Sequence, residues 1–361
     1  MISKSFYESL ESIANERGIA IEKILEKVEI AMQIACKNSD VPYKGDIKME
    51  YDIEKKEIKF VDIHYVVDEI DPDGPRGQIL LEDAKQLKSR VKVGQEIKEK
   101  VSLSSFKRKA ASMFKQNLLN ELKSLEREEA FDFFQDKVGE ILTARVVSAN
   151  ENYAVLNLKR GVDVTISYRD AIPGESFNAG EEKKVYVSAV EKTNKGPKIF
   201  ICRNSKDMVR KLFELNIPEV ANGNIEIMGI ARDPGNRTKV GVMSMSPDID
   251  AKGSCVGPQG MRIKEINQIL NGEKIDIFVW KNNPVDLIAE ALTPARVLSV
   301  MPDEKEKKAL VICSEDQFSL AIGKGGQNVK LAAFATGWKI DIKKLADAYE
   351  EGIKIDYNVT Y

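Results

Sequence analysis

The sequence is poor in the residues that hydrolytic and metal-dependent chemistry requires. Its 361 residues include one histidine, His64, and four cysteines that are scattered without a C-x-x-C pair. This pattern argues against a zinc site and against a disulfide framework. His64 lies in the apolar run IKFVDIHYVV, where a strand residue is expected rather than the base of a nucleophilic mechanism. The sequence therefore disfavours hydrolase chemistry, and we expect neither a metal nor a cofactor.

Long apolar segments and a bulk charge are also missing. No apolar run approaches the roughly 18 residues of a membrane helix, and the N-terminus has no signal-peptide core. The 55 basic and 57 acidic residues leave a net charge of −2, so attraction for phosphate must come from local clusters. An apolar share of 43% suffices for several cores, and the length allows two to four domains. We expect a cytoplasmic monomer without membrane contact.

The C-terminal part contains an internal repeat. The string SCVGPQGMRIKEINQILNGEKIDI aligns with LAIGKGGQNVKLAAFATGWKIDI, and Gly257 and Gly260 match Gly323 and Gly326 at an offset of 66. Apolar spacing after each G-x-x-G string predicts a helix, and a KIDI string follows as a strand. Each copy of about 65 residues is predicted to run strand, strand, helix, G-x-x-G, helix, strand. The earlier strands are expected at 225–231 and 239–245 in the first copy and at 296–300 and 308–313 in the second.

The preceding residues have two other periodicities. Between Val138 and Cys202 apolar residues alternate with polar ones, which predicts a small barrel of five strands. Before it, apolar positions from Ile21 to Ala35 and from Phe106 to Leu125 predict two amphipathic helices, with a hairpin at 47–53 and 57–67 between them. The predicted domains are residues 1–130, 135–203, 204–280 and 281–346, followed by a tail at 347–361.

The two G-x-x-G strings suit a nucleic-acid backbone. Glycine lets the main chain approach phosphates closely, and the helix that follows points unpaired N–H groups at them. KH modules clamp single-stranded nucleotides in this way. A nucleotide P-loop fits poorly, because no Ser or Thr follows Lys324. The candidate RNA-binding residues are Gly257, Pro258, Gln259, Gly260 and Arg262 in the first copy, and Gly323, Lys324, Gly325, Gly326, Gln327 and Lys330 in the second.

The predicted barrel and two basic clusters add weaker candidates. The barrel carries aromatic and basic side chains that suit base stacking, and we select Tyr153, Arg160 and Tyr168 among them. Seven basic residues lie between Lys192 and Lys211, and Lys107, Arg108 and Lys109 begin a stretch without acids on the long helix. A solvated helix face explains the second cluster equally well.

The pair Asp248-x-Asp250 could hold a metal ion, as a nuclease would require. It also precedes the helix that leads into the first G-x-x-G string, where Asp is an ordinary N-cap residue. Capping is the preferred interpretation.

The strings IPGESF, KLFELNIPEV, ARDPGNRTKVGV, CVGPQGMRI and SLAIGKGGQNVKLAAFATGWKIDI resemble the NusA family of bacterial transcription elongation and termination factors. The resemblance implies a multidomain α+β chain: an N-terminal α/β domain, an OB-type barrel of the S-one type and two tandem type II KH domains. It further implies a non-enzymatic factor that docks on RNA polymerase through the N-terminal domain, with Lys107, Arg108 and Lys109 as candidate contacts. The other modules would hold nascent single-stranded RNA, stabilise pausing and support termination or, with other Nus factors, antitermination.

Two departures from that family are visible. Gln259 stands where the family usually has a lysine, so the first turn is expected to rely on backbone N–H groups and Arg262, with a salt slope smaller by about one unit. The chain also ends soon after the second KH unit, so autoinhibition by acidic C-terminal repeats is not expected. Two rival interpretations stay open: an RNA-binding accessory of ribosome or degradation machinery, and a nuclease.

Overall fold

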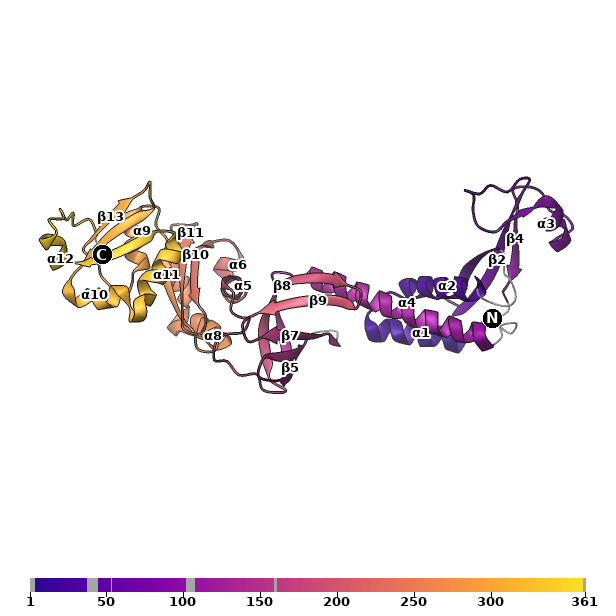
Figure 1. Cartoon of the computed structure of the whole chain (residues 1–361), viewed down its shortest axis with the longest axis horizontal. Helices are drawn as coiled ribbons and strands as arrows, with labels where there is room; N and C mark the ends of the chain where they lie inside the picture. The colour runs from indigo at the N-terminus through magenta and orange to yellow at the C-terminus, as the bar shows by residue number, and fades with distance from the viewer. Residues whose placement is uncertain (1–3, 38–44, 53, 102–107, 159–160, 360–361) are drawn as a thin grey trace. The chain divides into compact units, whose positions relative to one another are not determined.

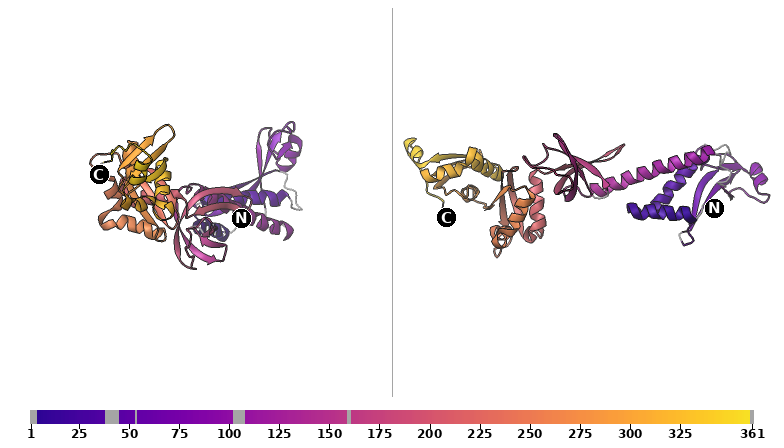
Figure 2. Two further views of the ribbon diagram at one scale, coloured as in Figure 1. Left: turned by 60° about the vertical axis from the view of Figure 1, so that its left-hand side comes forward. Right: turned by 90° about the horizontal axis from the view of Figure 1, so that it is seen from below.

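The computed structural model describes residues 4–37, 45–52, 54–101, 108–158 and 161–359. The chain divides into two compact units, each described by itself. Unit 1 contains Met1–Phe134 and Glu191–Pro197, and unit 2 contains Gln135–Val190 and Lys198–Tyr361. Figure 1 shows the elements of both units, and Figure 2 gives two further views.

Unit 1 combines helices with a mixed sheet. Its elements in chain order are α1 (Lys4–Arg17), α2 (Ile21–Lys37), β1 (Asp46–Asp52), β2 (Glu57–Val67), β3 (Gln78–Leu80), α3 (Leu81–Leu87), β4 (Glu96–Lys100) and α4 (Arg108–Gln135). β2 pairs with each of the other three strands. The predicted hairpin and the helix from Ile21 are confirmed, and the long helix is confirmed from Arg108 onwards. β3, α3 and β4 carried no clear sequence signal.

The core of unit 1 follows the predicted apolar faces. Leu25, Val28 and Met32 of α2 are buried together with Leu118 and Leu122 of α4. His64 lies in β2 opposite Ile97, and its Nε2 atom is 3.3 Å from Oδ2 of the buried Asp62. The expectation that His64 is a strand residue is therefore confirmed, and the structure adds that it is buried.

Unit 2 begins with most of a five-stranded antiparallel sheet that is nearly closed, whereas Glu191–Pro197, where its last two strands are joined, is grouped with unit 1. Its strands are β5 (Ile141–Ala149), β6 (Tyr153–Asn157), β7 (Asp163–Ser167), β8 (Glu182–Thr193) and β9 (Gly196–Cys202), in the order β7-β6-β5-β8-β9. Val164, Ile166, Val185 and Val187 are buried, as the predicted alternation requires. The expected barrel is confirmed.

The first repeat follows the barrel in unit 2. Its elements are α5 (Lys206–Asn216), α6 (Pro218–Ala221), β10 (Ile225–Asp233), β11 (Arg237–Ser244), α7 (Ala251–Val256), the short 3-10 helix η3 (Pro258–Gly260), α8 (Met261–Ile269) and β12 (Lys274–Val279). β10 pairs antiparallel with β11, and β12 pairs parallel with β11. The predicted order of elements is confirmed, and the helices α5 and α6 precede it.

The second repeat has the same topology. Its elements are α9 (Pro284–Ala291), β13 (Ser299–Asp303), β14 (Lys308–Cys313), α10 (Glu315–Ile322), η4 (Lys324–Gly326), α11 (Gln327–Thr336), β15 (Lys339–Lys344) and α12 (Leu345–Glu350). The strand predicted at 296–300 was wrong in its bounds. It extends through Pro302, which is tolerated because β13 is an edge strand and needs no N–H at that position. This order of helices and strands is that of a type II KH domain.

The two repeats pack on each other inside unit 2. Ala231 and Phe278 of the first repeat belong to one buried cluster with Leu292, Leu331 and Ala335 of the second. A Cβ atom on Gly229 of β10 would overlap the carbonyl oxygen of Ala335, so only glycine allows this approach of α11 to β10. Figure 1 shows β10, β11 and α11 side by side.

Candidate nucleic-acid interface

The two G-x-x-G turns have nearly the same backbone. Gly257 and Gly323 have φ/ψ of 73°/173° and 75°/170°, and Gly260 and Gly326 have 72°/19° and 77°/12°. Positive φ values of this kind favour glycine. The third position is also left-handed in both turns, but it is Gln259 (φ 51°) in the first and Gly325 (φ 61°) in the second. The first turn therefore holds a side chain in a conformation that side chains rarely adopt.

Close packing explains the first glycine of each turn. A Cβ atom on Gly257 would lie 2.8 Å from Cγ of Arg262, and one on Gly323 would lie 2.8 Å from Cβ of Asn328. Both neighbours come five residues after the glycine and pack beneath the turn. Only glycine therefore leaves room for these two neighbours at the first position of each turn.

The turns differ in the backbone donors that they offer. In each turn the N–H of the last glycine bonds back to the first, over 3.0 Å from Gly260 to Gly257 and 3.1 Å from Gly326 to Gly323. Pro258 has no N–H, whereas Lys324 keeps one. The first turn consequently has one backbone donor fewer. The sequence already contained this signal, and the prediction that the first turn relies on its N–H groups overlooked it.

Arg262 is held by protein partners. Its Nη1 atom donates to Oε2 of Glu219 over 2.8 Å and to the carbonyl oxygen of Ser254 over 2.6 Å, and its side chain is 28% exposed. The expected compensation for Gln259 by Arg262 would therefore have to compete with an ion pair. In the second repeat the equivalent Asn328 is buried and donates to the carbonyl oxygens of Leu292 and Ala321. Both residues fix the helix end before the turn.

Gln327 bridges the two repeats. Its Nε2 atom donates to Oδ2 of Asp233 at the end of β10 over 2.6 Å. Gln327 is thus engaged with protein, although it was predicted to bind RNA. Lys324, Gly325 and Lys330 are exposed on the same side of the turn.

Each repeat has a lysine that folds back on the last glycine of its turn. Cε of Lys330 lies 3.6 Å from the position of a Cβ atom on Gly326, and Cε of Lys264 lies 3.8 Å from that on Gly260. Nζ of Lys264 also donates to the carbonyl oxygen of Gln259 over 3.1 Å. Lys264 is a candidate that the sequence reasoning missed, although its offset of 66 from Lys330 could have revealed it.

A buried lysine joins the two repeats. Nζ of Lys239 on β11 donates to the carbonyl oxygen of Thr293 over 2.8 Å and lies 3.7 Å from Oδ2 of Asp276. Burial lowers the pKa of Lys239 to about 8, although the carboxylate of Asp276 opposes this effect. The amine therefore acts as a structural donor at this junction.

The barrel candidates fall in different environments. Tyr153 is 41% exposed at the start of β6, opposite Ser167 of β7. Tyr168 is half-buried, with its ring 5.9 Å from that of the buried Phe177. Arg160 lies outside the described residues. Tyr153 and Tyr168 occupy the same end of the β6–β7 hairpin, and Tyr153 offers the more accessible ring.

The structure does not describe the side chains of the three candidate polymerase contacts. Lys107 lies outside the described residues, and the side chains of Arg108 and Lys109 at the start of α4 are not described either. These three residues stay predictions.

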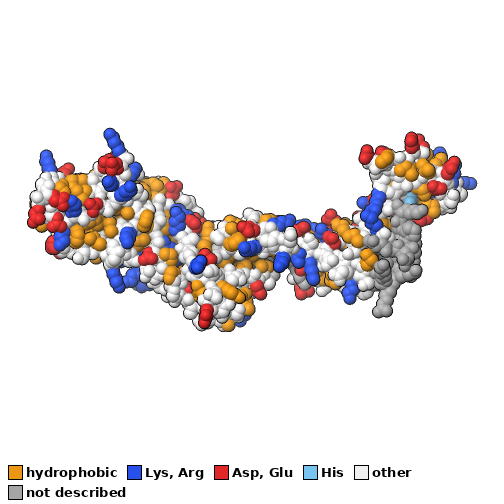
Figure 3. Space-filling view, in the orientation of Figure 1, with side chains coloured by type: hydrophobic (Ala, Val, Ile, Leu, Met, Phe, Trp, Pro, Cys, Tyr) orange, Lys and Arg blue, Asp and Glu red, His pale blue; other side chains and the backbone are white. Residues whose placement is uncertain are grey.

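The basic cluster from Lys192 to Lys211 is not a single surface. Arg203 is buried, and its Nε atom donates to both carboxylate oxygens of Glu175, over 2.9 and 2.8 Å. Its Nη2 atom also donates to the carbonyl oxygen of Ile269, which ties the barrel to α8. Lys211 forms ion pairs with Glu140 and Glu214. Figure 3 likewise shows Lys and Arg side chains interspersed with Asp and Glu on the face turned to the viewer.

Asp250 is an N-cap residue, as preferred over a metal ligand. Its side chain accepts a hydrogen bond from the backbone N–H of Lys252 at the start of α7. Among the described residues, no group of three or more His, Cys, Asp or Glu side chains could hold a metal ion. Nor does any described helix combine the length and the apolar character that crossing a bilayer would require.

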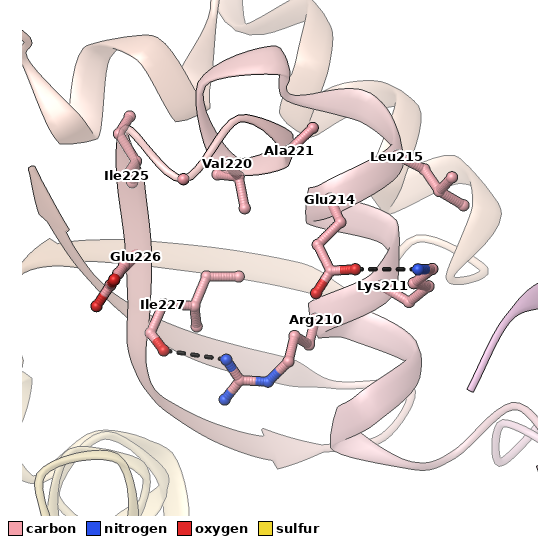
Figure 4. Close-up of a pocket in the computed structure, with 10 residues that line it drawn as sticks. Arg210, Lys211, Glu214, Leu215, Val220, Ala221, Ile225, Glu226 and Ile227 are labelled. Carbon is pink, nitrogen blue, oxygen red and sulfur yellow. Dashed lines mark hydrogen bonds and ion pairs between the residues drawn. The ribbon is translucent and has the colours of Figure 1, made fainter. Parts of the chain in front are cut away.

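A groove of about 460 Å³ opens elsewhere on the first repeat, between α5, α6 and the edge strand β10. Figure 4 shows that Arg210 and Lys211 approach it from α5 and Ile225 and Ile227 from β10. Nη1 of Arg210 donates to the carbonyl oxygen of Ile227 over 3.0 Å, and Lys211 pairs with Glu214. The bond from Arg210 covers part of the edge of β10, and the groove carries no functional assignment.

Comparisons with known proteins agree with this architecture. Residues 5–128 match the family profile of the NusA N-terminal domain, residues 203–280 that of the NusA-like first KH domain and residues 284–350 that of the NusA-like second KH domain. A solution structure of the N-terminal domain of NusA from B. subtilis matches over 35% of this chain and 99% of its own, at 26% identity and with a TM-score of 0.25.

Relatives match over nearly the whole length. The transcription termination/antitermination protein NusA of Bacillus subtilis is 36% identical over 352 residues, which are 98% of this chain and 94% of that protein. The protein of the same name from Thermus thermophilus is 34% identical over 353 residues, 95% of this chain and 90% of its own. The chain belongs to the NusA family, and it is an RNA-binding transcription factor with two tandem KH domains.

Proposed function

We propose that this protein binds RNA polymerase through unit 1 and holds nascent single-stranded RNA on the barrel and both KH domains, and that it thereby stabilises pausing and modulates termination and antitermination. The observation that carries the proposal is the duplicated turn. Two copies of the same left-handed glycine geometry, each followed by a helix of at least nine residues, offer main-chain donors to a sugar-phosphate strand.

The protein would act by binding the paused state of the transcription complex more tightly than the other states. Modules that are tethered to polymerase meet the emerging RNA at a high effective concentration, so that individually weak contacts add up. The domain boundaries predicted above describe how the chain distributes this work: residues 1–130 for polymerase, and 135–203, 204–280 and 281–346 for RNA. Within this proposal the protein is a cytoplasmic monomer that acts with other Nus factors and performs no catalysis.

A paused-transcription assay tests the proposal. The full chain should lengthen the lifetime of a pause. A variant with Pro258→Asp, Gln259→Asp, Lys324→Asp and Gly325→Asp should lose most of this effect, because four carboxylates at the turns repel phosphates. An unchanged pause lifetime with the wild-type chain would contradict the proposal.

Two further assays address the rival functions. A nuclease would degrade RNA and would stop on addition of EDTA; we expect no degradation in either condition. An RNA-binding accessory of ribosome or degradation machinery would not retain polymerase. Polymerase capture by the full chain, lost when residues 1–134 are deleted, supports the transcription factor, and RNA binding without polymerase capture supports the accessory.

A further inference from the structure

Phe334 is the most exposed large hydrophobic residue among those that the structure describes, with 77% of its surface accessible. It lies on α11, one helical turn after Lys330 and eight residues after the last glycine of the second turn. A single exposed apolar side chain needs no explanation by itself. Phe334 differs because it lines a groove of about 400 Å³ that also includes Lys324 and Gly325 of the turn.

The floor of this groove is fixed by bonds within the protein. Arg232 at the end of β10 forms a buried ion pair with Glu273 over 2.8 Å, and the neighbouring Asp233 accepts the hydrogen bond from Gln327. Leu331 is buried beneath them. The groups that remain exposed around the groove are the cations Lys324 and Lys330 and the ring of Phe334.

These exposed groups follow one another along η4 and α11, with Lys324 in η4 and Lys330 and Phe334 on α11. Eight residues of α-helix place Phe334 about 12 Å beyond Gly326, with Lys330 folded back toward the turn between them. The order is therefore a turn with main-chain donors, a cation and an aromatic face. A single strand of RNA offers matching groups, because phosphates alternate with bases that can stack on an aromatic ring.

The flanking charges favour RNA over a protein partner. Protein interfaces are poor in lysine at their centres and bury a contiguous apolar patch. Here one ring shares the groove with two lysines, Lys324 and Lys330, and the acid that lines the groove, Asp233, already accepts a hydrogen bond from Gln327. The first repeat has the exposed Gln268 at the position equivalent to Phe334, and Lys264 at that of Lys330. The ring is thus specific to the second repeat.

We propose that Phe334 is a stacking platform for one unpaired RNA base in the groove between the two KH domains, while Lys324 and Lys330 neutralise the adjoining phosphates. The inference rests on the proposed RNA-binding function and adds a base contact to it. It predicts that the second KH domain binds both the backbone and a base at this place, whereas the first has no ring at the equivalent position.

Binding of the full chain to an unstructured RNA of about 12 nucleotides, measured by fluorescence anisotropy, tests the inference. Phe334→Ala should weaken binding about tenfold, because losing the stacking on one aromatic residue corresponds to roughly a fivefold to hundredfold loss of affinity. Phe334→Trp should stay within about twofold of the wild type, since it retains an aromatic face. Gln268→Ala is the matched control in the first repeat and should have no effect.

A base-free ribose-phosphate oligomer of the same length separates stacking from an indirect effect. It should bind the wild type and Phe334→Ala equally, and the salt slope for RNA should be the same for both proteins, because no phosphate contact is lost. Equal RNA affinity of the wild type and Phe334→Ala would overturn the inference, and so would an equal loss of affinity for the base-free oligomer.

The double variant Lys324→Asp with Gly325→Asp distinguishes this inference from the proposed function. If that variant loses RNA affinity and Phe334→Ala does not, the stacking platform is wrong and the RNA clamp stands. If neither variant loses affinity, the proposed RNA-binding site is wrong as well.

Discussion

The two KH domains of this chain have one backbone design and different side chains on it. The φ/ψ values of their turns agree within a few degrees at the first and last glycine, and their sheets share the same pairing. The side chains differ at equivalent positions: Pro258 and Gln259 of the first domain correspond to Lys324 and Gly325 of the second. Arg262 likewise corresponds to Asn328, and Gln268 corresponds to Phe334. The turn geometry is thus common to both, and the groups that reach a ligand are not.

This difference indicates that the two domains contribute unequally to RNA binding. The second turn has a lysine, one more backbone N–H and an unstrained glycine, and an exposed ring follows it. The first turn has none of these and holds its arginine in an ion pair with Glu219. We therefore expect the second domain to contribute more of the affinity for RNA, and the first to extend the surface.

The largest expected effect is on the free energy of unfolding. It concerns the residue that precedes the last strand of each repeat, which is buried in both but is Glu273 in the first and Trp338 in the second. Glu273 is buried and accepts hydrogen bonds from Arg232 and from the N–H of Gly235, whereas the equivalent Trp338 fills the second copy as a buried ring. Glu273→Ala leaves a buried arginine unpaired and should cost about 3–5 kcal/mol. Trp338→Ala should cost about as much through the cavity. Urea unfolding measures both.

Glu306→Ala is the control for that experiment, because Glu306 forms an exposed ion pair with Lys308. It should change the free energy of unfolding by less than about 1 kcal/mol. A similar small cost for Glu273→Ala would show that its ion pair does not hold the first domain together.

The buried Lys239 gives the first domain a pH dependence that the second lacks, where Leu310 is equivalent. Its pKa of about 8 lies below the ordinary 10.5, so between these values the unfolded chain binds more protons than the folded one. The free energy of unfolding should therefore rise with pH over this range, by on the order of 3 kcal/mol from this group. Lys239→Leu should remove that rise in urea unfolding at pH 8 and pH 10. An identical rise in both proteins would contradict the buried amine.

The turns themselves should differ in their share of RNA affinity. Lys324→Asp with Gly325→Asp should weaken RNA binding at least tenfold. The change removes a cation and the glycine that lets phosphate approach the main chain, and it adds two carboxylates that repel phosphate. The backbone should accept the change, since Gln259 already has this conformation in the first copy and a Cβ atom on Gly325 would meet nothing within 4 Å. Pro258→Asp with Gln259→Asp should cost only about threefold. Gel shifts measure both, and equal losses would remove the proposed ranking of the two domains.

Strain in the first turn should be measurable as stability. Gln259→Gly relieves a left-handed side chain and should stabilise the first domain by about 1 kcal/mol, and Gly325→Gln should destabilise the second by a similar amount. Thermal unfolding of the two variants tests this pair. Opposite signs would mean that the Gln259 side chain makes a compensating contact.

The smallest effect concerns the salt dependence. Lys264→Gln and Lys330→Gln should each lower the slope of log affinity against log salt by about one, because both lysines fold back on their turns where a phosphate would lie. This corresponds to about a fourfold change between 50 and 200 mM salt. An unchanged slope for Lys264→Gln alone would restrict phosphate binding to the second domain.

Much of the fold was predictable because periodicity and duplication report on it directly. Alternation at Val185 and Val187 indicated the barrel, and the offset between Gly257 and Gly323 located both turns and the strands around them. The helices α5, α6 and α9 were not predicted, since they precede the strings that the two repeats share. β13 was misplaced because Pro302 and Asp303 mask an edge strand.

The candidate site was predictable in its backbone and not in its side chains. Sequence spacing brings Arg262 and Gln327 next to the turns, but only the structure reveals that Glu219 and Asp233 already bind them. Partners 43 and 94 residues away in sequence leave no local pattern. The exposure of Phe334 could not be predicted either, because an aromatic residue on an apolar helix is expected to be buried in the core.

The central claim is that nascent RNA lies on the two glycine turns, most tightly on the second. Photo-crosslinking from a benzoylphenylalanine placed at position 324, at position 258 or, as a control, at position 306 tests this in a paused transcription complex. We predict RNA crosslinks from 324 and weaker ones from 258, with none from 306. RNA that crosslinks from neither turn, while the complex still pauses longer with the protein bound, would contradict the account.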